Sequence, residues 1–434
     1  MRNLRADARS IWQAAVEAVR LGPLVRQALA DPQVAQALQA APRILVLGAG
    51  KAGAAMAAAV EEAIPDLLDR AQGIVNVPAE LVRPLRKIRL HAARPAGSNQ
   101  PTAEGVIGAE EMLGLARSAG PDDVALCLLS GGGSALLPAP AEGITLADKQ
   151  TVTKLLHECG ATINQMNAVR KHLSAIKGGR LAEAFRGKAL YSLIISDVIG
   201  DPLTVIASGP TCVDPTTFGD VVSLLNGLGL TDRLPHAVRT RLERGAAREI
   251  PETPKGMPGN IHNVILANNS MALAVAEKQA QGLGYTVLNL GSCIEGETRH
   301  VATAMMGIAH SIQDEGIPFR PPACVLLGGE TTVTLTPDHG LGGRNVEFVL
   351  AALLNLHGQR NMAILSGGTD GEDGPTDAAG AVADMSVLWK AVGSQMQEYL
   401  NRHDAYHFFE ATGDLIKTGL TETNVMDVRV ILIG

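Results

Sequence analysis

Two hydrophobic patterns of different length divide the chain. Residues 5–40 carry Ala and Leu at helical spacing, and Asp31-Pro32 marks a point where a new helix can begin. Beyond them, short apolar runs bounded by Gly, Ser, Asp or Pro alternate with longer segments of helical period. The runs of the first half are 43–47, 73–77, 124–129 and 190–195. Such alternation predicts βαβ units and an α/β fold built on a mostly parallel sheet.

A break near the middle separates this part from a second one. Residues 245–260 hold three prolines and no apolar period, which is typical of a linker. Strand-like runs then resume at 263–267, 286–290, 324–327, 331–335, 362–365 and 428–433, with a hairpin expected near 331–335. We therefore predict a Rossmann-like N-terminal domain over residues 1–245 and a second α/β domain over residues 261–434.

Length and composition agree with two packed domains and narrow the class of protein. The 434 residues exceed what one hydrophobic core usually supports, and 46% of them are apolar. A net charge of -7 with 3% aromatic residues argues against nucleic acid as a partner. No apolar run is long enough to cross a bilayer, and no secretory signal follows the first charged residues. Five scattered cysteines without a CxxC pair indicate a reducing compartment, so we expect a cytoplasmic protein without a membrane partner.

The first strand run leads into a glycine loop, Gly48-Ala-Gly50-Lys51-Ala-Gly53. It matches the GxGxxG pattern of dinucleotide sites, where glycines allow close approach of the backbone to a pyrophosphate. That reading also needs an acidic residue at the end of the next strand to hold the ribose, and this strand ends Val75-Asn76-Val77-Pro78. A lysine among backbone donors suits a phosphoryl or carboxylate oxygen, so we interpret Lys51 as an anion-holding or catalytic group, with an ordinary helix-start lysine as the alternative.

Two further loops follow strands of the first half. Ser130-Gly131-Gly132-Gly133-Ser134 has more glycines than a tight turn needs, and each costs roughly 0.5 to 1 kcal/mol of backbone entropy, which favours a phosphate cradle. The Walker A pattern is absent. Asp197 directly follows the run 190–195, at the strand end that forms the ligand crevice of open parallel sheets, whereas Asp201 precedes a proline and can cap a turn.

The second half repeats the combination of paired glycines with a polar side chain. The two segments are Gly328-Gly329-Glu330 and Gly342-Gly343-Arg344-Asn345. Arg344 precedes a segment of helical period, and an arginine at a helix N-terminus meets the unfavourable end of the helix dipole. An anion between them would reverse this, so we expect Arg344 to contact an anion, with a surface salt bridge as the alternative.

The most acidic stretch runs from Ser366 to Asp377 and contains four carboxylates, three hydroxyls and four glycines. Hard oxygen ligands of this kind suit a divalent cation, although the spacing is not that of an EF-hand. A solvated acidic turn is the alternative.

Taken together, these loops resemble the class II glycerate kinase family, whose C-terminal part is known as the MOFRL domain. The matching stretches cover most of residues 43–434 in the order of the family: 48–53, 130–136, 167–174, 177–180, 196–201, 208–210, 328–330, 342–345 and 367–380. The resemblance implies phosphorylation of D-glycerate to 2-phosphoglycerate with ATP and Mg²⁺, at a site between a Rossmann-like domain and the C-terminal domain. It also implies that Lys51, Asp197 and Arg344 are the catalytic group.

We accordingly assign Asp197 as base, Lys51 and Arg344 as charge stabilisers, and Asp370 with Asp373 as Mg²⁺ ligands. The predicted substrate and nucleotide contacts are Gly48, Gly50, Ser130, Gly131, Gly132, Gly133, Ser134, Arg170, Lys171, Gly328, Gly329, Glu330 and Asn345. The segment 91–99 departs from the His-Pro-x-Pro-Asp pattern of many family members, which leaves the acceptor open. A nicotinamide-dependent hydroxypyruvate reductase and a non-catalytic anion-binding protein are the alternative functions.

Overall fold

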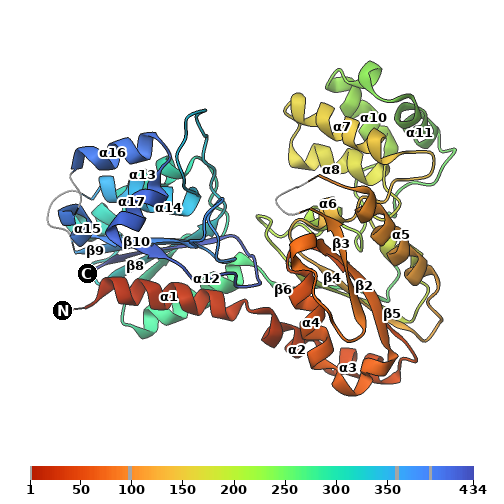
Figure 1. The fold of residues 1–434 in the computed structure, drawn as a ribbon, viewed down its shortest axis with the longest axis horizontal. Helices are drawn as coiled ribbons and strands as arrows, with labels where there is room; N and C mark the ends of the chain where they lie inside the picture. Colours follow the sequence, from red (N-terminus) through yellow and green to blue (C-terminus); the bar gives the residue numbers. More distant parts are fainter. Residues whose placement is uncertain (1, 96–99, 357–360, 391–392) are drawn as a thin grey trace. The chain divides into compact units, whose positions relative to one another are not determined.

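The chain folds into two compact units that do not follow the order of the sequence (Figure 1). A computed structural model describes residues 2–95, 100–356, 361–390 and 393–434. One unit comprises residues 21–266, and the other comprises residues 1–20 together with 267–434. No helix of the described residues combines the length and the apolarity that crossing a membrane requires.

The unit 21–266 is built on a six-stranded sheet in the order β3-β2-β1-β4-β5-β6. Its strands are β1 (Ile44–Ala49), β2 (Ala71–Pro78), β3 (Ile88–Arg94), β4 (Val124–Leu129), β5 (Ala189–Ile195) and β6 (Ile261–Ala267). The pairs β1–β2, β1–β4, β2–β3 and β4–β5 are parallel, as predicted. This is the strand order of doubly wound folds, in which the direction of winding reverses between β1 and β4 and ligands bind at the carboxyl ends of those strands.

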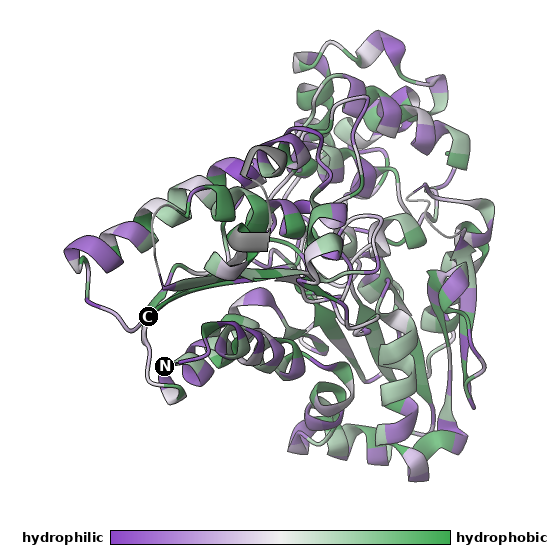
Figure 2. Ribbon diagram, turned by 60° about the vertical axis from the view of Figure 1, so that its left-hand side comes forward, coloured by the Kyte–Doolittle hydropathy of each residue, from purple (hydrophilic) through white to green (hydrophobic). Residues whose placement is uncertain are grey.

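Buried apolar side chains of the described residues support this unit. The helices are α2 (Leu21–Leu29), α3 (Pro32–Ala40), α4 (Gly53–Ala63), α5 (Ala103–Arg117), α6 (Gly133–Leu136), α7 (Leu146–Glu158), α8 (Ile163–His172), α9 (Arg180–Ala184), α10 (Phe218–Gly227) and α11 (His236–Ala246). The strands β1, β4 and β5 are buried along their whole length. Figure 2 shows that the strands of the chain are for the most part hydrophobic. A separate cluster holds α7, α8, α10 and α11 together.

The second unit also contains a six-stranded sheet, in the order β11-β10-β9-β12-β8-β7. Its strands are β7 (Thr286–Asn289), β8 (Ala323–Gly329), β9 (Met362–Gly368), β10 (Gly380–Asp384), β11 (Leu415–Ile416) and β12 (Asp427–Ile433). β7 runs parallel to β8, whereas β12 lies antiparallel between β8 and β9. The hairpin expected near 331–335 is wrong, because Thr332 forms only an isolated bridge, to Glu297.

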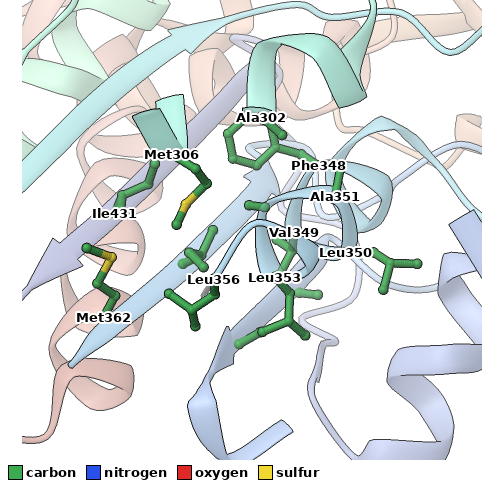
Figure 3. Close-up of a cluster of buried hydrophobic side chains, with 14 of the residues drawn as sticks. Ala302, Met306, Phe348, Val349, Leu350, Ala351, Leu353, Leu356, Met362 and Ile431 are labelled. Carbon is green, nitrogen blue, oxygen red and sulfur yellow. The ribbon is translucent and has the colours of Figure 1, made fainter. Parts of the chain in front are cut away.

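Helices cover both faces of this second sheet. They are α1 (Leu4–Ala18), α12 (Asn269–Gly282), α13 (Thr298–His310), α14 (Arg344–Leu354), α15 (Met385–Lys390), α16 (Gly393–Asn401) and α17 (Ala405–Thr412). In Figure 1, α1 lies on one face of the strands and α14 on the other. The core of the unit, shown in part in Figure 3, joins α13, α14 and the strands through side chains such as Met306, Phe348 and Ile431.

Two of the predicted boundaries need correction. The first helix belongs to the C-terminal unit, since α1 packs on α12, β9 and β12 and Trp12 Nε1 donates to Gly367 O at 3.1 Å. The proline-rich segment 245–260 is not a linker between the units. It packs inside the unit 21–266, where Thr253 Oγ1 donates to Asp214 Oδ2 at 3.0 Å, and the chain continues directly into β6.

Candidate active site

The glycine loops after β1 and β4 interlock at the carboxyl edge of the first sheet. Lys51 N donates to Gly131 O at 2.8 Å, and Ala52 N donates to Ser130 Oγ at 3.0 Å. A Cβ at Gly50 would overlap the Ser130 hydroxyl, so only glycine allows the two loops to approach this closely. The loops predicted separately from the sequence therefore form one structure, at the point where the winding of the sheet reverses.

Asp197 joins the same loops from the next strand along the sheet. It follows β5 after one residue and is half-buried. A Cβ at Gly131 would overlap the Asp197 carboxylate, and one at Gly132 would lie 3.3 Å from Lys51 Cγ. The structure thus brings the predicted base, the predicted cation and the glycine loop together, because the carboxyl ends of parallel strands meet at one edge.

Asn76 stands near the end of β2, where a dinucleotide site needs an acidic residue to bind the ribose. Asn76 near the end of β2 is fully buried, and its Nδ2 donates to Leu136 O at 2.7 Å and to Gly105 O at 3.2 Å. A buried amide that anchors α6 and α5 in this way leaves no acid for ribose hydroxyls.

The two predicted cations of α8 have different surroundings. Lys171 is buried, and its Nζ forms an ion pair with the buried Asp214 at 3.3 Å. Lys171 therefore contributes to the interior of this unit, and its role as a substrate or nucleotide contact stays a prediction. Arg170, which is half-buried, has no such carboxylate partner among the described residues.

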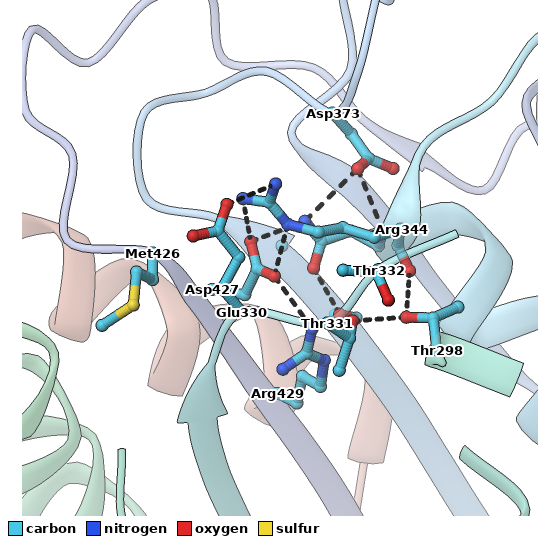
Figure 4. A network of polar contacts seen from close by, with 12 residues as sticks. Thr298, Glu330, Thr331, Thr332, Arg344, Asp373, Met426, Asp427 and Arg429 are labelled. Carbon is cyan, nitrogen blue, oxygen red and sulfur yellow. Dashed lines mark hydrogen bonds and ion pairs between the residues drawn. The ribbon is translucent and has the colours of Figure 1, made fainter. Parts of the chain in front are cut away.

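In the second unit, Arg344 is the first residue of α14, as predicted from the sequence. Its Nε and Nη2 donate to the two oxygens of Asp427 at 2.7 and 3.1 Å, and its Nη1 lies 2.9 Å from Glu330 Oε1 (Figure 4). Burial by itself lowers the pKa of Arg344, but Asp427 and Glu330 raise it overall. A surface salt bridge is excluded because Asp427 is fully buried.

Asp427 is the centre of this network. Its oxygens also accept hydrogen bonds from Asn345 Nδ2 at 2.9 Å and from Arg429 Nη2 at 2.8 Å. Burial favours protonation of the carboxyl, yet Arg344 and Arg429 hold the pKa of Asp427 below its usual value. The network places the guanidinium of Arg344 at the start of α14, where the buried carboxylate of Asp427 fixes its orientation (Figure 4).

Two aspartates of the acidic stretch 366–377, Asp373 and Asp370, have different surroundings. Asp373 is buried and caps α14, since its oxygens accept from Asn345 N at 3.0 Å and from Val346 N at 2.8 Å. Burial raises the pKa of Asp373 to about 7 in spite of these bonds. Asp370 is half-buried near Arg344, and burial also raises the pKa of its carboxyl. Within the described residues no group of three or more His, Cys, Asp or Glu side chains could hold a metal ion.

The remaining glycines predicted as binding residues allow other atoms to approach the backbone closely. A Cβ at Gly48 would overlap Leu128 O, one at Gly328 would overlap Asn269, and one at Gly329 would overlap Ile294. Of the departing segment 91–99, residues 96–99 lie outside the described residues.

Sequence reasoning missed Asp427 and Arg429. The apolar run 428–433 predicts a strand, and the two charges lie at the start of β12, two residues apart and so on one face of the strand. Two opposite charges at this spacing in a buried strand were a usable signal for an internal ion pair.

Comparisons with known proteins identify the family of the chain. Residues 7–243 match a domain of unknown function, DUF4147, and residues 323–427 match the MOFRL family. A glycerate 2-kinase of Pyrococcus horikoshii is 37% identical over 90% of this chain and 87% of its own length. An Agrobacterium vitis protein named as a hydroxypyruvate reductase is 43% identical over 94% of this chain and 92% of its own. A crystal structure of glycerate kinase from Thermotoga maritima superposes with a TM-score of 0.88 at 32% identity, covering 99% of each chain.

Proposed function

The chain belongs to the glycerate kinase family, and we propose that it transfers the γ-phosphoryl group of ATP to the 2-hydroxyl of D-glycerate, giving 2-phospho-D-glycerate and ADP. The observation that carries the proposal is the meeting of Lys51, Asp197 and the loop Ser130–Ser134 at one edge of the parallel sheet. Phosphoryl transfer needs a carboxylate to orient the hydroxyl, a cation near the moving group and backbone donors for its oxygens. Asp197, Lys51 and the glycine loop are the candidates for these three roles.

Asp197 is assigned as the general base that accepts the proton of the substrate hydroxyl. It lies directly beside Gly131, so a substrate held on the glycine loop is within its reach. Lys51 emerges from the preceding loop and is exposed, with its aliphatic chain close to Gly132. We assign its ammonium to the oxygens of the transferring phosphoryl group.

Arg344 is assigned as a charge stabiliser, the role that the resemblance to the family implies. Its guanidinium carries its charge at any physiological pH and is held in one orientation by Asp427 and Glu330. A fixed cation costs little reorganisation when negative charge develops, which is the condition for transition-state stabilisation.

The residues present fit Mg²⁺ bound with a nucleotide. Mg²⁺ usually takes one or two protein carboxylates and completes its shell with water and substrate phosphates. Asp370 and Glu330 are partly exposed carboxylates near Arg344 and are the proposed donors, whereas Asp373 uses both oxygens to cap α14. When bound, the ion would neutralise charge on the phosphates.

Product identification after incubation of the protein with ATP, Mg²⁺ and D-glycerate tests the proposal. We expect ADP and the 2-phosphate of glycerate in equal amounts, and the 3-phosphate would contradict the assigned regiochemistry. The reductase name of one relative is tested in parallel by following NADH absorbance with hydroxypyruvate. We expect no oxidation, because Asn76 replaces the ribose acid.

A further inference from the structure

Three cations gather in the interior of the unit 21–266, and the charges that act on them are mainly other cations. Lys149 on α7 is 8% exposed, and Lys177 between α8 and α9 is 1% exposed. Arg170 repels both of them. Within the described part of the chain, none of the three forms an ion pair with a carboxylate. We call Lys149, Arg170 and Lys177 the cation cluster.

Burying three cations without an ion-pair partner costs free energy of folding unless a bound anion compensates their charge. A buried charge without a partner loses its hydration and gains nothing in return. Burial accordingly lowers the pKa of Lys149 to about 7 and that of Lys177 well below its usual value. Lys171, one residue after Arg170, shows the ordinary arrangement, since it has the buried Asp214 beside it at 3.3 Å. The contrast on one helix indicates that the cluster serves a ligand.

Hydrogen bonds connect the cluster to the glycine loop. Lys177 Nζ donates to Ser134 O at 2.7 Å and to Ser134 Oγ at 3.0 Å. The Ser134 hydroxyl lies 2.8 Å from Ser208 Oγ, which donates to Asn167 Oδ1 at 3.1 Å. Lys149 Nζ donates to Ala139 O at 3.3 Å. In its protonated form each lysine has three donors, so both then keep at least one N–H beyond these bonds.

The backbone beside Ser134 is strained. Ala207 and Ser208 have φ of 50° and 61°, a region that residues with a side chain rarely adopt. Gly178 N and Gly179 N hold this turn by donating to Ser208 O and Gly209 O at 3.1 and 2.7 Å. Strain of this kind persists where the surroundings impose it and is concentrated at functional sites. It supports the cluster as a site independently of the charges.

We propose that the cation cluster binds the carboxylate of the sugar-acid substrate beside the loop Ser130–Ser134. Arg170 and Ser134 are partly exposed and make the contact, while Lys177 is a positioning residue that orients the Ser134 hydroxyl and supplies charge beneath it. Asp197 lies against Gly131 of the same loop. Because the 2-hydroxyl of glycerate is on the carbon next to the carboxylate, the proposal requires one molecule to contact Ser134 and Asp197 together.

This inference rests on the proposed function, and the test separates the two. Calorimetry measures the Kd of the full chain for D-glycerate, for its neutral amide and for ATP. The variants are Lys177→Met and Arg170→Met, with the exposed Lys188→Met and Arg186→Met as matched controls. A carboxylate bound by cations should bind far more tightly than the amide, and each cluster variant should reduce that preference about tenfold or more, with ATP affinity kept.

An unchanged preference in both cluster variants overturns the inference. So does a loss of ATP affinity with glycerate binding intact, because the bound anion would then be a nucleotide phosphate. A wild-type chain that neither binds nor phosphorylates D-glycerate contradicts the proposed function as well, whereas a wild-type chain that does both leaves only the inference at risk.

A second measurement is the number of protons that the protein takes up when glycerate binds. A carboxylate next to Lys149 raises its pKa from about 7, so glycerate binding at pH 7.5 should take up protons. Arg170 and Arg241, which also act on Lys149, do not titrate in this range, whereas Lys177, on which Lys149 acts, is a second group that can take up a proton. Calorimetry in two buffers of different ionisation enthalpy measures the uptake. Lys149→Met should reduce it, and equal uptake in the variant would remove Lys149 from the site.

Discussion

Asp197 and Asp201 are two carboxylates of one loop with different surroundings. Asp197 lies against the glycine loop, while Asp201 has a φ of 54° in the turn that follows. We expect Asp197→Asn to keep the fold and lower kcat by about 10² to 10⁴, the usual contribution of a positioned general base.

Asp201→Asn is the matched control, because asparagine tolerates a positive φ and so should preserve the turn. Steady-state kinetics of both variants makes the comparison. If Asp201→Asn loses as much turnover as Asp197→Asn, the assignment of the base is wrong.

Arg344 combines catalysis with stability. Removing it leaves the buried Asp427 with one cation fewer, and breaking a buried ion pair from one side costs about 3–5 kcal/mol. Arg344→Ala should therefore lower both the melting temperature and kcat, the latter by about 10³ to 10⁵ if the arginine stabilises the phosphoryl group.

Arg344→Lys separates these effects, because a lysine keeps the charge and loses the two-pronged contact. We expect it to recover most of the melting temperature and only part of kcat. Kinetics measured below the melting transition decides the matter, and a normal kcat in Arg344→Ala would show that the residue is structural.

At the scale of elements, the N-terminus of α14 is capped by the buried carboxyl of Asp373, and ionising this carboxyl lowers the stability of the folded state. The pKa of Asp373 is raised to about 7 by burial, above the value of about 3.9 in an unfolded chain. Between these values the folded state binds the extra proton, so the stability that this group contributes is complete below about pH 4 and is lost as pH rises through 7.

Asp373→Asn should flatten this part of the pH profile. An asparagine keeps one acceptor for the N–H groups of Asn345 and Val346 but does not ionise. Losing the other acceptor costs about 1 kcal/mol, the usual value of a helix cap. Melting curves at pH 5 and pH 8 should differ in the wild type and converge in the variant, and parallel profiles would place the titration elsewhere.

At the scale of the whole molecule, the first helix stabilises strands from the other end of the sequence. Trp12 is 1% exposed and donates to Gly367 O of β9. Trp12→Ala should cost about 3–5 kcal/mol, as for other large buried side chains. Hydrogen exchange should accelerate in β9 and β12 and stay unchanged in β1 and β4. The exposed Gln13→Ala is the control, and equal acceleration in both units would contradict the division at residue 20.

A ligand that fits the proposed site should raise the melting temperature of the protein, and a ligand that does not fit should leave it unchanged. A ligand that binds only the folded state adds about 2.7 kcal/mol at a hundred times its Kd. Mg-ATP should therefore raise the melting temperature by several degrees, and NADH should not. A shift with NADH and none with Mg-ATP would favour the reductase.

The sequence alone determined the class of fold and much of the first site. Runs of apolar residues indicate strands because the alternation of short runs and helical segments is a local property, and glycine loops after strands indicate close backbone approach for the same reason. Lys51 and Asp197 could be placed together because parallel strands all end at one edge. These inferences need no knowledge of which segments pack on which.

The tertiary structure decided what long-range packing controls. The pairing of Arg344 with Asp427 joins residues 83 apart, and the antiparallel insertion of β12 between β8 and β9 brings them together. The packing of α1 on the C-terminal sheet likewise cannot be predicted from its helical period. The period shows that one face of the helix is buried, but it does not show which element covers that face. Lys171 is paired with the buried Asp214, whereas the cation cluster has no carboxylate partner in the described part of the chain, a difference that depends on tertiary packing. A side chain's charge is local, but its cost and its partner depend on everything that packs around it.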